Sequence, residues 1–294
     1  MPHANGGCGV APVREADGCR ILHRLEIREG PTGEGDTDAP FVAAIVDVET
    51  TGIDHEQDAI IQLGLRRFRF DRSGVVTKID RPYSWLEDPG RPIPPEITRL
   101  TGITDAMVAG HEIDAGAVER MLTNSAIVIA HNSAFDRKWI ERRMPAAAGL
   151  AWACSMADVD WQARGFDGCK LGFLVMQCGW WFEAHRADAD VDAVIALLRH
   201  RFDDGRTALQ ELLETAAEPS WIVRARGAAF EQKNRLRARG YRWDADRKVW
   251  WKHVRDGERV AEEFWLAGHV YSAEARPRVL GPDFERVDCW RRYA

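Results

Sequence analysis

The feature that most constrains this chain is a pair of carboxylates at the end of an apolar run. The segment FVAAIVDVETTG, residues 41–52, predicts a buried strand, and Asp47 and Glu49 stand two positions apart near its end. Side chains alternate between the faces of a strand, so both carboxylates point the same way. Such a pair is common at solvated strand ends, but a bound divalent cation would also offset its repulsion.

The length and composition fit a globular chain with more than one unit. A chain of 294 residues is long enough for one large domain and one small domain. Residues 1–38 are rich in Gly, Asp, Pro and Thr, which predicts a mostly disordered extension. We find no apolar run of about 18 residues and no apolar core of a secretory signal, so we expect a cytoplasmic protein without membrane contact.

Apolar patterns after residue 40 predict an α/β fold. Strands are expected at residues 60–72 and 74–86, with a turn at 71–74, and at 125–130. Helices are expected at residues 133–144 and 191–202, and a proline-rich loop leads into a short helix at Pro95–Thr101. Strands followed by strands alternating with helices favour a mixed β-sheet flanked by helices.

Two further segments place polar residues where a ligand site can form. In AHNSAFDRKW a strand ends at Ala130, a helix begins near Ser133, and Asp136 falls in its first turn. In EAHRADADVDAV, we place His185 on the loop that enters a helix and Asp190 on its early, inward-facing turn. For Asp136, the structural alternative is a carboxylate that only stabilises the helix dipole. For His185 and Asp190, the alternative is the start of a helix with a solvated acidic face.

Together the three segments resemble the DnaQ-like 3′→5′ exonuclease superfamily, in its DEDDh subgroup with four acidic residues and a histidine. The motifs are D-x-E-T-T-G at residues 47–52, H-N-x-x-F-D at 131–136 and H-x-A-x-x-D at 185–190. The resemblance covers about residues 39–205 and implies an RNase H-like fold. The family usually has an apolar residue at the position of Asp188, which adds negative charge here.

The resemblance implies metal-dependent release of nucleoside monophosphates from a 3′ end. Two Mg²⁺ or Mn²⁺ ions would be held by Asp47, Glu49, Asp136 and Asp190, with Asp47 bridging them. His185 is the expected general base. The substrate contacts that the resemblance implies are Thr50, Thr51, Gly52, Ile103, Asn132 and Phe135. For Phe135, core packing beside Trp139 is the alternative.

The C-terminal part of the chain differs in charge from the rest. Residues 219–294 hold 17 Lys and Arg against 11 Asp and Glu, and six of the twelve Trp. Residues 206–218 are expected to be a helix end and linker, followed by a small α+β domain with a helix, a hairpin and a second helix. The tryptophans fit either a small domain core or a surface for single-stranded nucleic acid.

Several functions stay open at this point. We favour DNA 3′ ends over RNA 3′ ends as the substrate, in proofreading or repair. A module that binds nucleic acid without catalysis is the other alternative. A clamp-binding peptide is not supported, because Glu214 stands where an aromatic residue belongs in ALQELLETA. Association with a polymerase and the oligomeric state cannot be predicted, and without a P-loop we expect no use of ATP.

Overall fold

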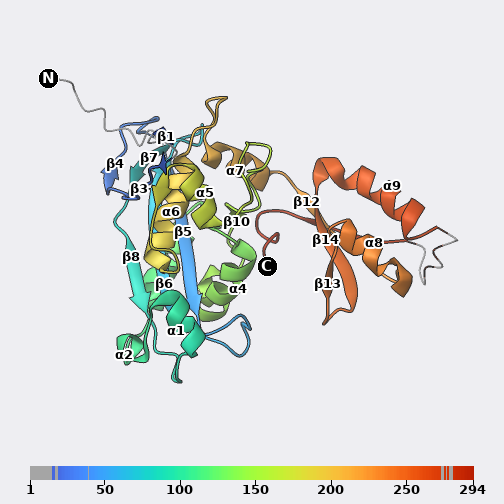
Figure 1. The fold of residues 1–294 in the computed structure, drawn as a ribbon, viewed down its shortest axis with the longest axis horizontal. Helices are drawn as coiled ribbons and strands as arrows, with labels where there is room; N and C mark the ends of the chain where they lie inside the picture. Colours follow the sequence, from blue (N-terminus) through green and yellow to red (C-terminus); the bar gives the residue numbers. More distant parts are fainter. Residues whose placement is uncertain (1–14, 17–18, 39, 273–274, 276, 278–280) are drawn as a thin grey trace. The chain divides into compact units, whose positions relative to one another are not determined.

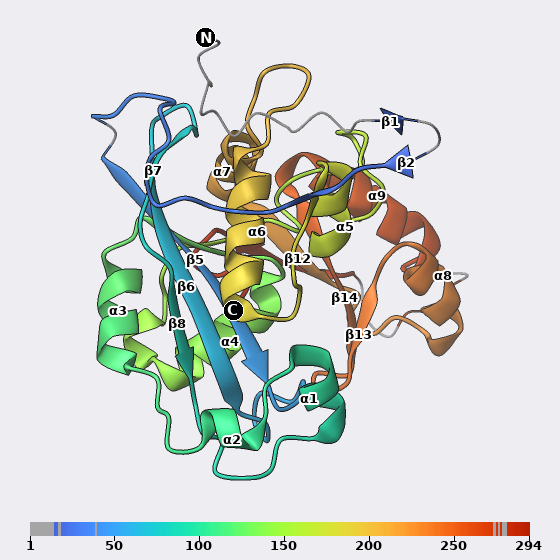
Figure 2. The ribbon, with the colours of Figure 1, turned by 60° about the vertical axis from the view of Figure 1, so that its left-hand side comes forward.

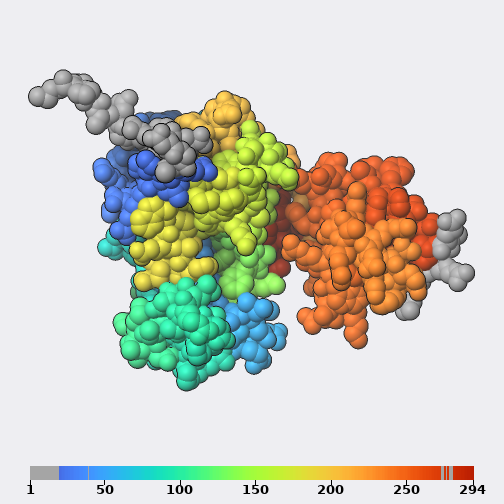
Figure 3. Space-filling view, viewed as in Figure 1, coloured from blue at the N-terminus to red at the C-terminus, as the bar shows by residue number. Residues whose placement is uncertain are grey.

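The computed structural model describes residues 15–16, 19–38, 40–272, 275, 277 and 281–294. The chain divides into two compact units, Met1–Ala216 with Tyr293–Ala294, and Ala217–Arg292 (Figure 1). In the space-filling view, the first unit runs from blue to gold and the second from orange to red (Figure 3). Among the described residues, no helix combines the length and apolarity that crossing a bilayer requires.

The first unit is built on a mixed seven-stranded sheet with strand order β10-β9-β5-β6-β7-β4, and β8 also pairs with β6. β5, β9 and β10 are parallel to one another, and the other pairs are antiparallel. The strands are β4 Gly30–Pro31, β5 Phe41–Thr50, β6 Ile60–Phe70, β7 Val76–Ile79, β8 Tyr83–Leu86, β9 Ile127–Ala130 and β10 Trp152–Cys154. The predicted mixed sheet is therefore confirmed.

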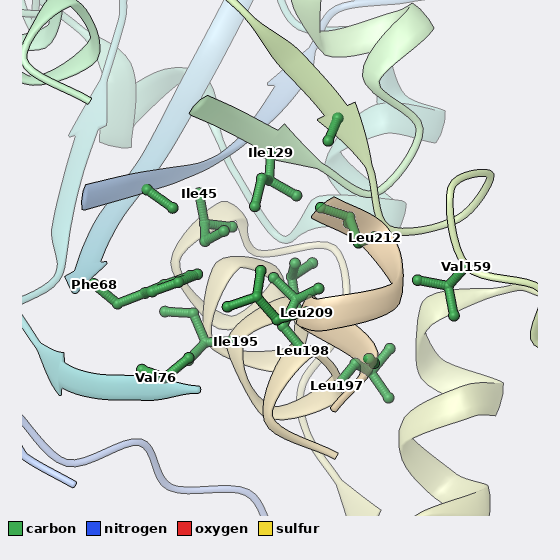
Figure 4. Packing of buried hydrophobic residues seen from close by; sticks show 14 of the residues in the cluster. Ile45, Phe68, Val76, Ile129, Val159, Ile195, Leu197, Leu198, Leu209 and Leu212 are labelled. Atoms are coloured by element: carbon green, nitrogen blue, oxygen red, sulfur yellow. The ribbon is translucent and has the colours of Figure 1, made fainter. Parts of the chain in front are cut away.

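Helices cover both faces of this sheet (Figure 2). One face packs against α5 Leu171–Gln177, α6 Ala187–Arg199 and α7 Ala208–Ala217. Figure 4 shows part of that core, where Ile45 and Phe68 of the sheet meet Ile195 and Leu209 of the helices. The other face packs against α3 Ala115–Thr123, α4 Ser133–Arg143 and the 3-10 turn Pro145–Ala147. α1 Pro95–Thr101 and α2 Asp105–Val108 follow β8, and α1 has the predicted bounds.

The first turn of α6 lies against β6 through three residues that share one face of that strand. A side chain at Gly64 would overlap the backbone carbonyl of Ala187. The Gln62 Oε1 atom accepts the Ala187 N–H at 3.2 Å, and Arg66 Nη1 lies 2.7 Å from the Asp192 carboxylate. Because Gln62 and Arg66 are almost fully buried, these bonds fix where α6 begins.

The expectation that residues 1–38 are disordered is wrong for most of the part that the structure describes. β3 His23–Arg24 pairs with β11 Trp180–Trp181, and β4 extends the main sheet by pairing with β7. The Glu34 carboxylate pairs with Arg199 of α6 at 2.9 Å and with Arg201. β1 Glu15–Ala16 pairs with β2 Cys19–Arg20, while residues 1–14, 17 and 18 lie outside the described residues.

Residues 206–218 are not a helix end and linker as expected. α7 is a complete helix, and its residues Leu209, Leu212 and Ala216 are buried in the core of the first unit. The last two residues also differ from the expectation, since Tyr293 packs in the first unit and donates its hydroxyl to Asp158 at 2.7 Å. Long-range packing, which the local pattern does not reveal, assigns both segments to the larger unit.

The second unit is an antiparallel four-stranded sheet with strand order β13-β14-β12-β15 and two helices. Its elements are β12 Ser220–Arg224, α8 Lys233–Ala238, β13 Arg242–Asp244, β14 Val249–Arg255, α9 Arg259–His269 and β15 Asp283–Val287, with 3-10 turns at Phe230–Gln232 and Asp256–Glu258. Its core joins Val223 and Val254 of the sheet to Leu236 and Leu266 of the helices. The predicted helix, hairpin and second helix are present, whereas β12 and β15 were not expected.

We predict that Gly64→Ala lowers the free energy of unfolding by roughly 1–3 kcal/mol, because the added methyl group must push α6 away from β6. Urea denaturation of parent and variant measures this. Gly172→Ala in α5 is the matched control, since nothing lies within 4 Å of the place that its added methyl group would take, and it should leave stability unchanged or slightly higher. Equal stability of the Gly64→Ala variant and the parent would contradict the close approach.

Candidate active site

One pocket is lined by polar residues from each of the three motifs. It is a cavity of about 360 Å³ lined by Asp47, Val48, Glu49, His131, Asn132, Phe135, Asp136, His185 and Asp190. The volume falls in the range of small-molecule sites. The structure therefore brings together all five predicted catalytic residues.

Three elements deliver the carboxylates to this pocket. β5 supplies Asp47 and Glu49 near its carboxyl end, next to the carboxyl end of the parallel strand β9. α4 begins directly after β9 and supplies Asp136 from its first turn. α6 supplies Asp190 from its first turn, so the carboxyl edge of the parallel strands forms the site.

Three of these carboxylates are close enough to share a cation. Ligand oxygens of Asp47, Glu49 and Asp190 all lie within 4.8 Å of one another. Three carboxylate oxygens this close together are hard ligands that suit Mg²⁺ or Mn²⁺. The residues present therefore fit the divalent ions that the motifs imply.

Asp136 lies in the same pocket but outside this group of three. Its side chain is almost fully buried, and its Oδ1 accepts the backbone N–H of Val48 at 3.1 Å. That bond ties the first turn of α4 to β5 between the two motif carboxylates. Asp136 is thus held beside the group by the backbone of β5.

The environment strongly disfavours ionisation of these carboxyl groups. Burial, with the neighbouring charges of Asp136, Asp190 and Glu49, raises the pKa of Asp47 well above its ordinary value. Burial and Asp190 raise the pKa of Glu49 to about 7, against a lowering by Arg186. Burial raises the pKa of Asp136 to about 8 and that of Asp190 to about 6, although backbone N–H donors oppose both shifts. A divalent cation would remove the repulsion that contributes to these shifts.

Two histidines line the pocket, His131 after β9 and His185 before α6. Both ring nitrogens of His131 are engaged, Nδ1 with Ser155 Oγ and Nε2 with the Cys169 carbonyl, each at 2.8 Å. Burial lowers the pKa of His131 to about 4. His185 lies, as predicted, on the loop before α6, where it adopts a left-handed backbone with φ of 66°. The next residue, Arg186, donates its N–H to Asp190 Oδ2 at 3.0 Å, which links the histidine loop to the carboxylate group.

The predicted substrate contacts divide into two sets. Asn132 and Phe135 line the pocket, and Phe135 also packs against Trp139 with ring centroids 5.8 Å apart. The hydroxyls of Thr50 and Thr51 are instead engaged within the loop that follows β5. Thr50 donates to the Gly52 carbonyl, and Thr51 donates to Asp58 at 3.1 Å.

The predicted contact of Ile103 with the terminal bases does not agree with its position. Ile103 is fully buried in a small cluster with Ile61, Ile93 and Val108, so it has no surface to offer to a base. The exposed apolar residue next to the first motif is Ile53, whose side chain is 90% exposed. Helix packing after α1, which the local sequence does not show, buries Ile103.

Sequence reasoning did not assign a role to the residues that position the site. The signal was present in IIQLGLRRF, where Gln62, Gly64 and Arg66 alternate with apolar residues along a buried strand. Ser133, expected to cap α4, is inside the helix, and its hydroxyl donates to the Ala153 carbonyl at 2.6 Å. The residue that precedes α4 is Asn132, with φ of 105°.

Asp188, the unusual residue of the third motif, does not line the pocket. Its carboxylate is partly exposed and lies 3.4 Å from Gln62 Nε2 and 3.9 Å from Arg186 Nε. Its charge contributes to the raised pKa of Asp190 but it is not one of the three clustered carboxylates.

We predict that, in the presence of a chelator, Asp136→Asn becomes more stable relative to the parent as the pH rises from about 6 to above 8. In the parent, the folded state holds the Asp136 proton up to about pH 8, whereas the unfolded state loses it near its ordinary pKa of 3.8. The free energy of unfolding of the parent therefore falls as the pH rises to about 8 and then levels off. Asparagine keeps an acceptor for the Val48 N–H and carries no charge. Urea midpoints measured across this range test the prediction, and His131 affects both proteins equally. A stability difference that does not change with pH would contradict it.

Comparisons with known proteins assign a family to this part of the chain. A family model described as Exonuclease matches residues 44–198, more than half of the chain. The DNA polymerase III subunit epsilon of Treponema pallidum is 28% identical over 160 residues, which are 51% of this chain and 72% of that protein. The PolC-type DNA polymerase III of Staphylococcus aureus is 33% identical over 139 residues, 45% of this chain but only 9% of that protein.

A solved structure shows the same fold. Exonuclease I aligns with a TM-score of 0.50 and 16% identity, covering 85% of this chain and 63% of that chain. Exonuclease X in complex with 5′-overhanging duplex DNA is 26% identical, covers 59% of this chain and 99% of that chain, and has a TM-score of 0.41. The fold of the first unit is RNase H-like. The chain belongs to the exonuclease family, in the DnaQ-like superfamily that its three motifs predicted.

Proposed function

We propose that this exonuclease hydrolyses phosphodiester bonds at the 3′ ends of DNA, in the 3′→5′ direction, and releases nucleoside monophosphates. The observation that carries the proposal is the convergence of Asp47, Glu49 and Asp190, whose oxygens lie within 4.8 Å, in one pocket with Asp136 and His185. All five positions of the DEDDh pattern are filled.

The carboxylates would hold two divalent ions, Mg²⁺ or Mn²⁺. Asp47 suits the bridging position, because the charges of Glu49, Asp136 and Asp190 all raise its pKa. Glu49 and Asp190 would complete one ion site, and Asp136 would support the second through water. Bound ions of this kind offset the charge on the attacking and leaving oxygens of a phosphoryl displacement.

His185 is the proposed general base that takes the proton of the attacking water. It lines the pocket on the same short loop whose next N–H binds Asp190, so its ring is held close to the carboxylate group. His131 is a poor candidate for this role, since both of its ring nitrogens have protein partners and its pKa is lowered to about 4.

DNA is proposed as the substrate because the matched relatives are the epsilon subunit of a DNA polymerase III and a PolC-type DNA polymerase III. A role in proofreading or repair follows from the same likeness. Ile53, exposed beside Gly52, is the proposed apolar contact with the terminal base, in place of the buried Ile103.

We predict that His185→Ala lowers the rate constant of hydrolysis by about 100- to 10,000-fold while the affinity for DNA changes little, because the general base acts only in the chemical step. Single strands labelled at the 5′ end, as DNA and as RNA of one sequence, are incubated with Mg²⁺, with Mn²⁺ or with chelator. A ladder that shortens from the 3′ end in DNA, and only with metal, is the expected result.

Asp188→Asn is the matched control, because it removes a carboxylate from the same helix outside the clustered group. It should keep activity within a few-fold of the parent, whereas Asp47→Ala should abolish it. Preferential shortening of RNA would move the substrate to RNA 3′ ends. Shortening from the 5′ end would overturn the proposed 3′→5′ direction. Equal rates of hydrolysis by His185→Ala and the parent would overturn the assignment of His185 as general base.

A further inference from the structure

We propose that the second unit binds single-stranded nucleic acid through a strip formed by Phe230, Lys233, Arg237, Trp250 and Trp243. This proposal rests on the proposed function in one respect, that the substrate of the chain is nucleic acid. The strip would be a second contact for that substrate, separate from catalysis. The strip runs from the turn before α8, along α8, to the β13–β14 hairpin.

Contacts within the unit connect these five residues in sequence. The Lys233 ammonium lies 4.0 Å from the centre of the Phe230 ring. Arg237 stands one helical turn after Lys233, and its guanidinium carbon lies 6.0 Å from the Trp250 ring. Trp250 is paired across the hairpin with Trp243, and their rings are 5.5 Å apart. Two groups of aromatic and cationic residues, Phe230 with Lys233 and Arg237 with Trp250 and Trp243, are therefore joined by one turn of α8.

The strip carries apolar surface that the core of the unit does not use. Phe230 is 73% exposed and Trp243 is 51% exposed. Trp221 and Trp265 instead pack against the core, as expected for most tryptophans of this unit. Trp250 also contacts the core and so anchors the exposed ring of Trp243 on a fixed base. Large exposed aromatic rings at neighbouring positions are typical of a binding surface.

Several basic residues of the second unit are paired with carboxylates, whereas, among the described residues, the two cations of the strip are not. Arg224 pairs with Glu285, Arg226 with Asp283, and both Arg239 and Lys252 with the buried Glu262. Within the part of the chain that the structure describes, no carboxylate lies within 4.0 Å of Lys233 or Arg237. Their charge is therefore available to an external anion.

This combination fits a single strand of nucleic acid. Exposed rings can stack on unpaired bases, and cations between the rings can contact the phosphates that link those bases. A duplex hides the faces of its bases, so it could use the cations but not the rings. The strip therefore provides a binding place for single-stranded nucleic acid on the second unit.

Binding of a labelled single strand of about 16 nucleotides to the full chain, measured by fluorescence anisotropy in chelator, tests this directly. Trp243→Ala should weaken binding by about 5- to 150-fold, the effect of losing one stacked base. Trp243→Phe should keep most of the affinity. The double variant Lys233→Ala with Arg237→Ala should reduce the slope of log affinity against log salt by about 1.4, for two lost phosphate contacts.

Matched controls separate the strip from general surface effects. Phe264→Ala removes another aromatic ring, 75% exposed, from α9, and Arg286→Ala removes an exposed cation from β15 at the opposite edge of the sheet. Both should bind like the parent. Unchanged affinity and salt slope in the strip variants, or equal losses in the controls, would overturn the proposal.

Hydrolysis of a labelled trinucleotide distinguishes failure of the strip from failure of the proposed function. The strip variants should cleave it at the parental rate, whereas Asp47→Ala should not cleave it. A chain without nuclease activity whose strip variants still lose affinity would support the strip and refute the proposed function. Loss of trinucleotide cleavage in Trp243→Ala would overturn the assignment of Trp243 to a separate contact.

Discussion

The site depends on how closely the first turn of α6 lies against β6. Gly64 leaves room for the Ala187 backbone, Gln62 binds the Ala187 N–H, and buried Arg66 pairs with Asp192 one turn further on. With its start fixed in this way, α6 presents Asp190 to the carboxylates of β5. The loop that precedes the helix then carries His185 to the rim of the same pocket.

That packing creates an electrostatic cost that the protein groups in the pocket do not fully offset. Four carboxyl groups lie in one pocket, with Asp136 and Asp190 buried and Asp47 and Glu49 half-buried. Their pKa values are raised although backbone N–H donors and Arg186 act against the shifts. A rigid, buried set of oxygen ligands of this kind is unfavourable without cations and favourable with them. The same burial lowers the pKa of His131 and so keeps its ring neutral, with both nitrogens engaged by protein partners.

Local chemistry made part of this fold predictable from the sequence. Pro95 at the start of α1 and Gly102, with φ of 73°, at its end define that helix, and its bounds were predicted correctly. The carboxylates were found because strand periodicity places Asp47 and Glu49 on one face. Contacts between distant segments were not predictable in this way. β4 pairs with β7, α2 and β6 bury Ile103, and Tyr293 packs in the first unit. Each of these contacts depends on tertiary packing between segments far apart in the sequence.

The most direct test of the account is the number of protons released when Mn²⁺ binds. Isothermal titration at pH 7, in buffers of different ionisation enthalpy, gives both the affinity and the protons released. The pKa values of Glu49 and Asp136 are raised to about 7 and about 8, so both groups still hold protons at pH 7 that the ion must displace. We therefore predict that binding of Mn²⁺ releases about one proton or more, and that Asp47→Asn binds Mn²⁺ much more weakly. Binding without proton release, and with equal affinity in Asp47→Asn, would show that the ion binds elsewhere and would contradict a buried carboxylate site.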